Sequence, residues 1–154
     1  MLDGFNLYKL HSYTNKMSLL LLNDDTEYLK VLDELFSGLF DNVSVAQLPS
    51  VAIRKLNEKE FDILITDNFM PEMYGVELIE KVRDGSIITN EPLRKKIIDI
   101  PILMMTGENS IKAGKEFSTF FSHFSRCDFH MMDNDDAGNF NKLLEKLYVL
   151  IEQS

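Results

Sequence analysis

The chain has 154 residues, 45% of them hydrophobic, which suits one domain with a single core and leaves no room for a second domain of ordinary size. Its formal net charge of −9 disfavours direct binding to nucleic acid or to an anionic membrane, because both need clustered Lys and Arg. One cysteine, no apolar run of membrane-spanning length and no start resembling a secretory signal together favour a cytoplasmic protein without a membrane span.

The first 16 residues carry scattered apolar side chains without a sustained period, so the sequence does not place them. We therefore treat residues 1–16 as an N-terminal extension of unknown role and residues 17–154 as the folded domain.

Short apolar runs alternate with longer stretches of helical period along the rest of the chain. The runs predicted as strands are residues 18–22, 43–46, 61–66, 102–105 and 128–132. The stretches predicted as helices are residues 26–40, 49–56, 75–83, 112–124 and 137–152. Between the third helix and the fourth strand, residues 84–99 contain Gly85 and Pro92 and are predicted to be an irregular insertion. Five strand and helix repeats predict an α/β fold with a doubly wound, five-stranded parallel sheet and flanking helices.

Polar residues follow three of the predicted strands at their carboxyl ends. Asp24 and Asp25 come after the first strand, Asp67 after the third and Thr106 after the fourth, so all four should meet at one edge of the sheet. Each aspartate alone has an ordinary explanation, since Asp25 could cap the helix that begins at Thr26. Three carboxylates together would raise one another's pKa values unless a hard cation neutralised them. The cluster therefore predicts a Mg²⁺ site.

The segment that starts at Asp67 carries a family resemblance. Its sequence, Asp-Asn-Phe-Met-Pro-Glu-Met-Tyr-Gly from residue 67 to residue 75, resembles the phospho-acceptor loop of response-regulator receiver domains in two-component signalling. The Asp24-Asp25 pair resembles the acidic pair of that family, and Thr106 resembles its switch hydroxyl. The resemblance covers about residues 18–152 and implies a flavodoxin-like receiver fold.

The resemblance also implies roles for individual residues. Asp67 would accept a phosphoryl group from a phosphohistidine on a histidine kinase or a histidine phosphotransfer protein. The Mg²⁺ ligands would be Asp24, Asp25, Asp67 and the backbone carbonyl of Phe69. The phosphoryl-binding and switch residues would be Thr106, Gly107 and Phe129. Core packing is an equally good explanation for Phe129. The chain would be a single-domain regulator rather than an enzyme, and its output would pass to a downstream protein in trans.

The fifth predicted strand departs from the family pattern. Met132 stands where receivers normally carry a lysine that pairs with the acceptor and its phosphoryl group. Loss of such a charge-assisted hydrogen bond should cost roughly 1.5 to 3 kcal/mol. The alternative function is therefore a degenerate receiver that serves as a constitutive interaction module without phosphorylation. Lys112 and Lys115 could substitute for the lysine, although a solvated surface position is the simpler interpretation.

Other functions fit the residues less well. A phosphatase with an aspartate nucleophile needs an acid two residues later, where this chain has Phe69. That bulky side chain could instead shield an acyl phosphate from water, which predicts slow hydrolysis. A nucleotide-binding domain would need a glycine-rich loop after the first strand, and none is present. The aromatic stripe of the predicted helix 112–124 fits core packing, with a homodimer patch as the alternative; it comprises Phe117, Phe120, Phe121 and Phe124.

Overall fold

A computed structural model describes residues 6–132 and 136–153, and only the backbone of residues 136–139 among these. The strands in this part of the chain are β1 Ser18–Leu22, β2 Asn42–Ala46, β3 Ile63–Asp67, β4 Ile102–Thr106 and β5 Cys127–Met131. The helices are α1 Leu7–Thr14, α2 Thr26–Ser37, α3 Pro49–Leu56, α4 Gly75–Asp84, α5 Glu91–Ile97, α6 Ile111–Phe121 and α7 Asp136–Glu152. None of the described helices is long and apolar enough to cross a membrane.

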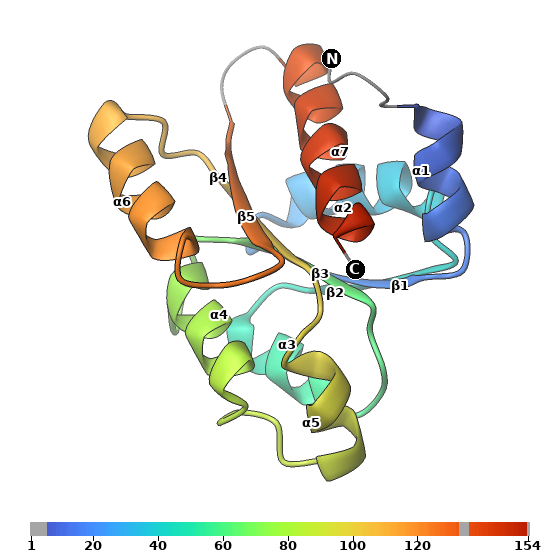
Figure 1. The fold of residues 1–154 in the computed structure, drawn as a ribbon, viewed down its shortest axis with the longest axis vertical. Coiled ribbons are helices and arrows are strands. Elements are labelled where there is room, and N and C mark those ends of the chain that lie inside the picture. Colours follow the sequence, from blue (N-terminus) through green and yellow to red (C-terminus); the bar gives the residue numbers. More distant parts are fainter. Residues whose placement is uncertain (1–5, 133–135, 154) are drawn as a thin grey trace.

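The strands form one parallel sheet with the order β2-β1-β3-β4-β5 (Figure 1). The predicted doubly wound, five-stranded parallel sheet with flanking helices is therefore confirmed. The chain leaves β1 toward β2 on one side and later enters β3 on the other side, so the strand order reverses between β1 and β3. Ligands of such sheets bind at the carboxyl ends of the strands beside this reversal, where Leu22 pairs with Thr66.

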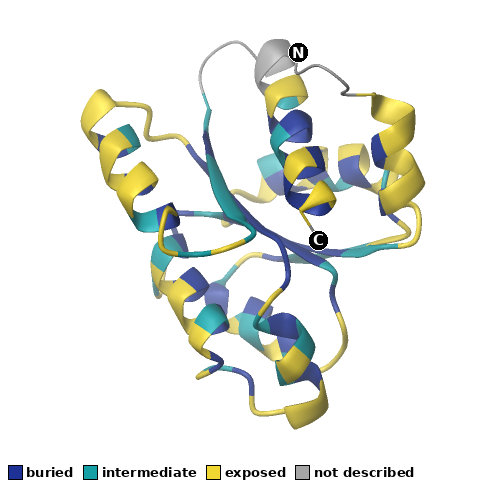
Figure 2. Cartoon of the chain, viewed as in Figure 1, coloured by how far each residue is buried: buried dark blue, intermediate teal, exposed yellow. Residues whose placement is uncertain are grey.

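The sheet separates two apolar layers, because alternate side chains of each strand point to opposite faces. Leu20, Leu64 and Met104 pack toward α3, α4, α5 and α6. On the other face, Leu19 and Ile63 pack toward α1, α2 and α7. Figure 2 shows the strands buried in the middle of the molecule and the helices exposed on their outer sides. The continuous apolar runs read from the sequence reflect burial on both faces.

The segment that the sequence left unplaced contains a helix. Asn6 caps α1 through its side chain, and Leu10 and Thr14 of α1 are completely buried in the α2 and α7 layer. The Thr14 hydroxyl donates to the carbonyl of Leu39 at 2.7 Å. Burial of one apolar side chain per helical turn gives too weak a period to recognise in the sequence.

The insertion of residues 85–99 is ordered around a helix, so the prediction of irregular structure was wrong. Gly85 ends α4 with a φ of 76°, and the side chain of Asn90 caps α5 by accepting the N–H of Leu93. Pro92 lies in the first turn of α5, where a missing N–H costs no helical hydrogen bond. Proline therefore marks a helix start here and not an interruption.

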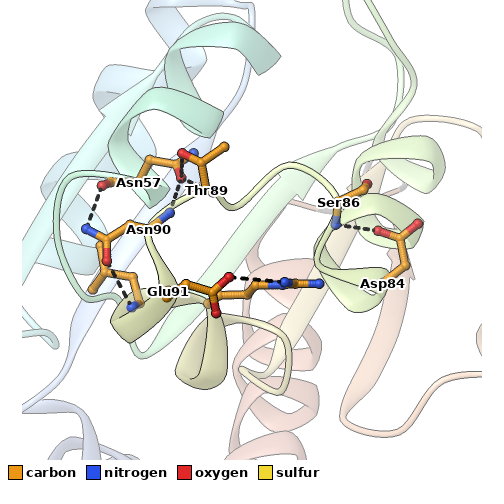
Figure 3. Close-up of polar contacts among 8 residues, drawn as sticks. Asn57, Asp84, Ser86, Thr89, Asn90 and Glu91 are labelled. Carbon is orange, nitrogen blue, oxygen red and sulfur yellow. Dashed lines mark hydrogen bonds and ion pairs between the residues drawn. The ribbon is translucent and has the colours of Figure 1, made fainter.

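The side chain of Asn57 fixes this insertion to the end of α3 (Figure 3). Its Oδ1 accepts the N–H of Thr89 at 2.7 Å, and its Nδ2 donates to the carbonyl of Ile87 at 2.9 Å. Arg83 of α4 donates to the carbonyls of Ile98 and Ile100. The insertion thus closes the amino ends of the strands, at the edge of the sheet opposite Asp67.

Two predicted helices end earlier than their apolar pattern. Helix α2 ends at Ser37, before Gly38, although Phe40 beyond it is buried. Helix α6 ends at Phe121, and Phe117 and Phe121 are buried, which supports core packing for this part of the aromatic stripe. Turn residues that pack on the core continue the pattern after the helical backbone has stopped.

Candidate functional site

A pocket of about 250 Å³ lies where β1, β3 and β4 end. It is lined by Asn23, Asp25, Tyr28, Asp67, Met105, Thr106, Gly107 and Met132. Five of the predicted site positions therefore share one pocket, although they come from four different strands or the loops after them. Parallel strands in matched register produce this convergence, because their carboxyl ends coincide at one edge.

Asp67 is the last residue of β3 and is partly buried in this pocket. Its Oδ1 accepts the N–H of Asn68 at 2.7 Å. Burial, together with the charges of Asp24 and Asp25, raises the pKa of its carboxyl to about 6, although the N–H groups of Asn68 and Phe69 partly oppose this rise. The ionised carboxylate is thus a costly group that a cation or a covalent modification would relieve.

The acidic pair after β1 lies near Asp67 without forming a compact cluster. Asp25 is exposed and caps α2, since its Oδ1 accepts the N–H of Tyr28 at 3.1 Å. Asp24 is exposed and does not line the pocket. No group of three Asp, Glu, His or Cys side chains in the described segments is close enough to hold a metal ion as it stands. The ordinary capping role of Asp25 is present, and the preformed three-carboxylate cluster is not.

The donor set of the pocket nevertheless fits a hard divalent cation. Asp25 and Asp67 both line it, and carboxylate oxygens are the ligands that Mg²⁺ prefers. The cap of α2 uses one of the two Asp25 oxygens. Burial and, to a smaller extent, repulsion from Asp24 and Asp25 raise the pKa of Asp67, and a bound cation would offset both effects by stabilising the ionised carboxylate.

Thr106 and Gly107 form the wall of the pocket at the end of β4. The Thr106 hydroxyl accepts the N–H of Glu108 at 3.1 Å, and the side chain is buried. A Cβ added to Gly107 would meet no atom within 4 Å, so this position faces open space. Gly107 therefore leaves room beside the Thr106 hydroxyl.

Met132 lines the pocket at the position of the usual lysine. None of the described residues lining this pocket is Lys or Arg. Lys112 is exposed on α6 and pairs with Glu116, and Lys115 lines a groove between α6 and β5. Neither lysine side chain lines the pocket in place of the usual lysine, which agrees with a surface position for both.

The loop from Asp67 to Gly75 folds tightly over the backbone of Asp67. The N–H of Gly75 donates to the carbonyl of Asn68 at 2.9 Å, and a Cβ on Gly75 would lie 2.3 Å from the Asp67 carbonyl oxygen. The buried Asn68 side chain accepts the N–H of Val76 at 3.2 Å and so caps α4. Sequence reasoning missed Asn68, whose only signal was an amide side chain shortly before a helix start.

The two predicted aromatic residues lie outside the pocket. Phe69 is 57% exposed and packs edge-on against Tyr74, with ring centroids 5.4 Å apart. Phe129 packs between Phe117 and Phe121, with ring centroids 5.5 and 5.3 Å away. The core-packing interpretation of Phe129 therefore describes this structure.

Lys146 of α7 also holds Phe129 and was not predicted. Its Nζ donates to the Phe129 carbonyl at 2.6 Å and lies 5.3 Å from the centre of the ring. Burial lowers the pKa of this amine. A lysine on the buried side of a helix gave no sequence signal, because its partner is a backbone carbonyl of another element.

Comparison with curated proteins shows relatives among transcriptional and two-component regulators. The transcriptional regulatory protein ZraR of Klebsiella oxytoca is 29% identical over 101 residues, which cover 66% of this chain and 20% of ZraR. The two-component response regulator ARR11 of Arabidopsis thaliana is 31% identical over 98 residues, which cover 61% of this chain and 16% of ARR11. The chain thus spans a fifth or less of the length of these two relatives.

Solved structures show the same fold. A CheY-like response regulator receiver domain protein from Methanospirillum hungatei JF-1 aligns with a TM-score of 0.64 and 21% identity over 90% of this chain and 99% of that chain. TrrA of Thermotoga maritima, in complex with Mg²⁺-BeF, aligns with a TM-score of 0.63 and 19% identity over 87% and 98%.

The family profile described as the response regulator receiver domain matches residues 19–119, about two thirds of the chain. These residues run from β1 into α6 and contain the acidic pair, Asp67, its loop and Thr106. The chain therefore belongs to the response regulator receiver domain family.

Proposed function

We propose that the chain is a phosphorylation-dependent regulator that accepts a phosphoryl group on Asp67 from a phosphohistidine of a histidine kinase or phosphotransfer protein. The observation that supports this most directly is the pocket that joins Asp67 with Asp25 and Thr106 at the carboxyl ends of the strands. A carboxylate partly buried beside open space can both attack an incoming phosphorus and lose an unfavourable charge by doing so.

The proposed transfer is a single displacement. An oxygen of the Asp67 carboxylate attacks the phosphorus in line with the bond to the imidazole nitrogen. That P–N bond breaks, its electron pair stays on the imidazole, and an acyl phosphate remains on Asp67. Bound Mg²⁺ would supply charge neutralisation for the phosphoryl oxygens. Its proposed ligands are Asp24, Asp25, Asp67 and the backbone carbonyl of Phe69.

Thr106 is the proposed sensor of the phosphoryl group. Its hydroxyl, which now accepts the N–H of Glu108, would donate to a phosphoryl oxygen. Gly107 leaves the space for that oxygen. The Thr106 carbonyl accepts the N–H of Met132 at 2.8 Å, so a shift of this residue would also displace the end of β5. The altered surface would then be presented to a downstream protein.

A constitutive interaction module is the second candidate function. Met132 in the pocket favours it, because the thioether of Met132 cannot form the ionic hydrogen bond that a lysine forms with a phosphoryl group. The acceptor loop and Asp67 favour phosphorylation. We also propose that the protein is cytoplasmic and can form a homodimer. Any hydrolysis that it catalyses would act only on its own acyl phosphate.

Intact-mass spectrometry after incubation with Mg²⁺ and acetyl phosphate tests the proposed function. We expect a phosphate-sized gain that requires Mg²⁺ and disappears in Asp67→Asn. The control Asp41→Asn changes an exposed aspartate outside the pocket by the same chemistry and should retain the gain. Absence of the gain with acetyl phosphate and with phosphohistidine donors would instead select the interaction module.

A further inference from the structure

Two helices beside the acceptor loop lack a capping side chain of their own. Leu48 is the N-cap residue of α3 and Tyr74 is that of α4, and neither makes a side-chain cap hydrogen bond. The first N–H groups of a helix have no partner within the helix, so a cap normally comes from the N-cap residue itself. Here the acceptor loop supplies both caps, through Asn68 to α4 and through Glu72 to α3.

The cap of α3 consists of two hydrogen bonds to one carboxylate. The N–H of Ser50 donates to Oε1 of Glu72 at 2.8 Å, and the hydroxyl of Ser50 donates to Oε2 at 2.9 Å. Glu72 lies 22 residues after Ser50 in the sequence. A carboxylate at the amino end of a helix also interacts favourably with the helix dipole. Both oxygens of Glu72 are therefore committed to α3.

Glu72 has a backbone conformation that is unfavourable for a residue with a side chain. Its φ is 74°, a conformation that side chains other than glycine rarely adopt. Among the described residues only Arg126 shares a positive φ without being glycine. Glycine would fit this turn with less strain, but it would remove the carboxylate. Glu72 thus makes the contact with Ser50 at the cost of a strained backbone conformation.

Glu72 lies between the two ends of a closed loop. Before it, Asp67 and Asn68 leave β3; after it, Gly75 returns to hydrogen-bond the Asn68 carbonyl. Because Gly75 lies against the Asp67 carbonyl, the two ends of the loop are packed together, and Phe69 lies between the first end and Glu72. The carbonyl of Phe69 is one of the proposed metal ligands.

We propose that Glu72 is a positioning residue, which through Ser50 holds the acceptor loop in the conformation that binds Mg²⁺ and accepts the phosphoryl group. This inference rests on the proposed function. It makes α3 part of the acceptor machinery: the amino end of α3 anchors the loop, and the acceptor loop in turn orders that end of α3.

We call the two hydrogen bonds between Ser50 and Glu72 the clamp. Three variants separate the effect of the clamp from that of backbone strain at residue 72: Glu72→Gln, Glu72→Gly and Ser50→Ala. Glu72→Gly removes both, Ser50→Ala removes one donor and leaves the N–H, and Glu72→Gln keeps the shape without the charge. Glu80→Gln, an exposed change of equal charge on α4, is the matched control. Hydrogen exchange by NMR reports the amides of Ser50, residues 68–70 and residues 72–74. Calorimetry reports Mg²⁺ affinity, and intact mass reports the phosphorylation rate.

In Glu72→Gly we expect the Ser50 and loop amides to exchange about fivefold faster or more. We also expect Mg²⁺ affinity and phosphorylation rate to fall by about fivefold to tenfold, with smaller losses in Ser50→Ala and none in Glu80→Gln. Global unfolding in urea should change little, because lost strain and lost cap oppose each other.

Two results distinguish the failure of this inference from that of the proposed function. If the wild type is phosphorylated and Glu72→Gly binds Mg²⁺ and reacts at the same rate, the clamp only caps α3 and the inference is wrong. If the wild type is neither phosphorylated nor bound by Mg²⁺, the proposed function fails. In that case unchanged exchange of the loop amides in Glu72→Gly would also reject the clamp, whereas faster exchange would retain its role in holding the loop.

Discussion

The backbone N–H of Met132 donates to the carbonyl of Thr106 at 2.8 Å, beside the pocket that holds Asp67. The proposed switch hydroxyl and the residue that replaces the usual lysine are thus tied through the main chain. Coupling between β4 and β5 at this point does not depend on a charged side chain. The Met132 side chain changes only the lining of the pocket, where an apolar thioether takes the place of an ammonium group.

Met132→Lys should restore a cation to the pocket. An ammonium near Asp67 favours its ionised form, so we expect the pKa of Asp67 to fall below the present value of about 6. A pH titration of the Asp67 carboxyl by carbon NMR in metal-free buffer measures this. Met132→Leu is the control of similar volume and should leave the titration in place. An unchanged pKa in Met132→Lys would mean that this side chain does not reach the acceptor.

Asp67→Asn should stabilise the metal-free protein at pH 7.5. The folded protein holds the Asp67 proton more tightly than the unfolded chain does, because the folded-state pKa is raised to about 6. The stabilisation that this proton provides is fully present below the unfolded pKa of Asp67 and is lost as the pH rises through about 6, so the ionised carboxylate destabilises the fold at pH 7.5. After allowance for solvent screening of this partly exposed group, the gain should be about 1 kcal/mol.

Urea unfolding of both proteins in EDTA measures this difference, which should vanish near pH 4. Saturating Mg²⁺ should reverse its sign, because the metal stabilises only the form that has the carboxylate. Equal stability of the two proteins at pH 7.5 without metal would show that the acidic pocket imposes no cost.

Gly75→Ala and Gly107→Ala test the shape of the site. A Cβ at position 75 would lie 2.3 Å from the Asp67 carbonyl oxygen, so the loop would have to shift. We expect a loss of about 3 kcal/mol or more in the free energy of unfolding. A Cβ at position 107 meets nothing within 4 Å, and Gly107→Ala should change stability by less than about 0.5 kcal/mol. Urea titrations check both; equal effects would contradict the tight packing at Gly75.

Phe69→Ala should shorten the life of the phosphorylated protein. Phe69 lies two residues after Asp67, and its exposed ring packs on Tyr74 outside the pocket; we expect this ring to restrict the approach of water to an acyl phosphate on Asp67. Loss of the phosphate-sized mass after removal of the donor measures hydrolysis, and we expect a several-fold faster loss in the variant. A wild-type half-life of only seconds would count against the shielding. Val31→Ala removes an exposed apolar side chain on α2 and should leave the rate unchanged.

The sequence by itself determined the sheet and five of the seven described helices, and it singled out Asp67 as the proposed acceptor. Strands such as β3 are buried on both faces, so their apolar runs are continuous and local. The loop after Asp67 also has a local signature, because Pro71 fixes its own φ and Gly75 has no Cβ to clash with the nearby Asp67 carbonyl. Only the tertiary structure placed α1 and α5, since these short helices depend on partners far along the chain, such as Leu39 for Thr14 and Asn57 for the residues before α5.

Tertiary structure also decided what the site residues do. Asp25 caps α2, Asp24 stays outside the pocket, and Phe129 packs against α6, all of which depend on side-chain directions that strand order does not specify. Neither Asn68 nor Glu72 was predicted, because a cap that comes from another element leaves no fixed spacing in the sequence. Local periods and turn residues are written in the chain, whereas contacts between distant side chains exist only once the chain has folded.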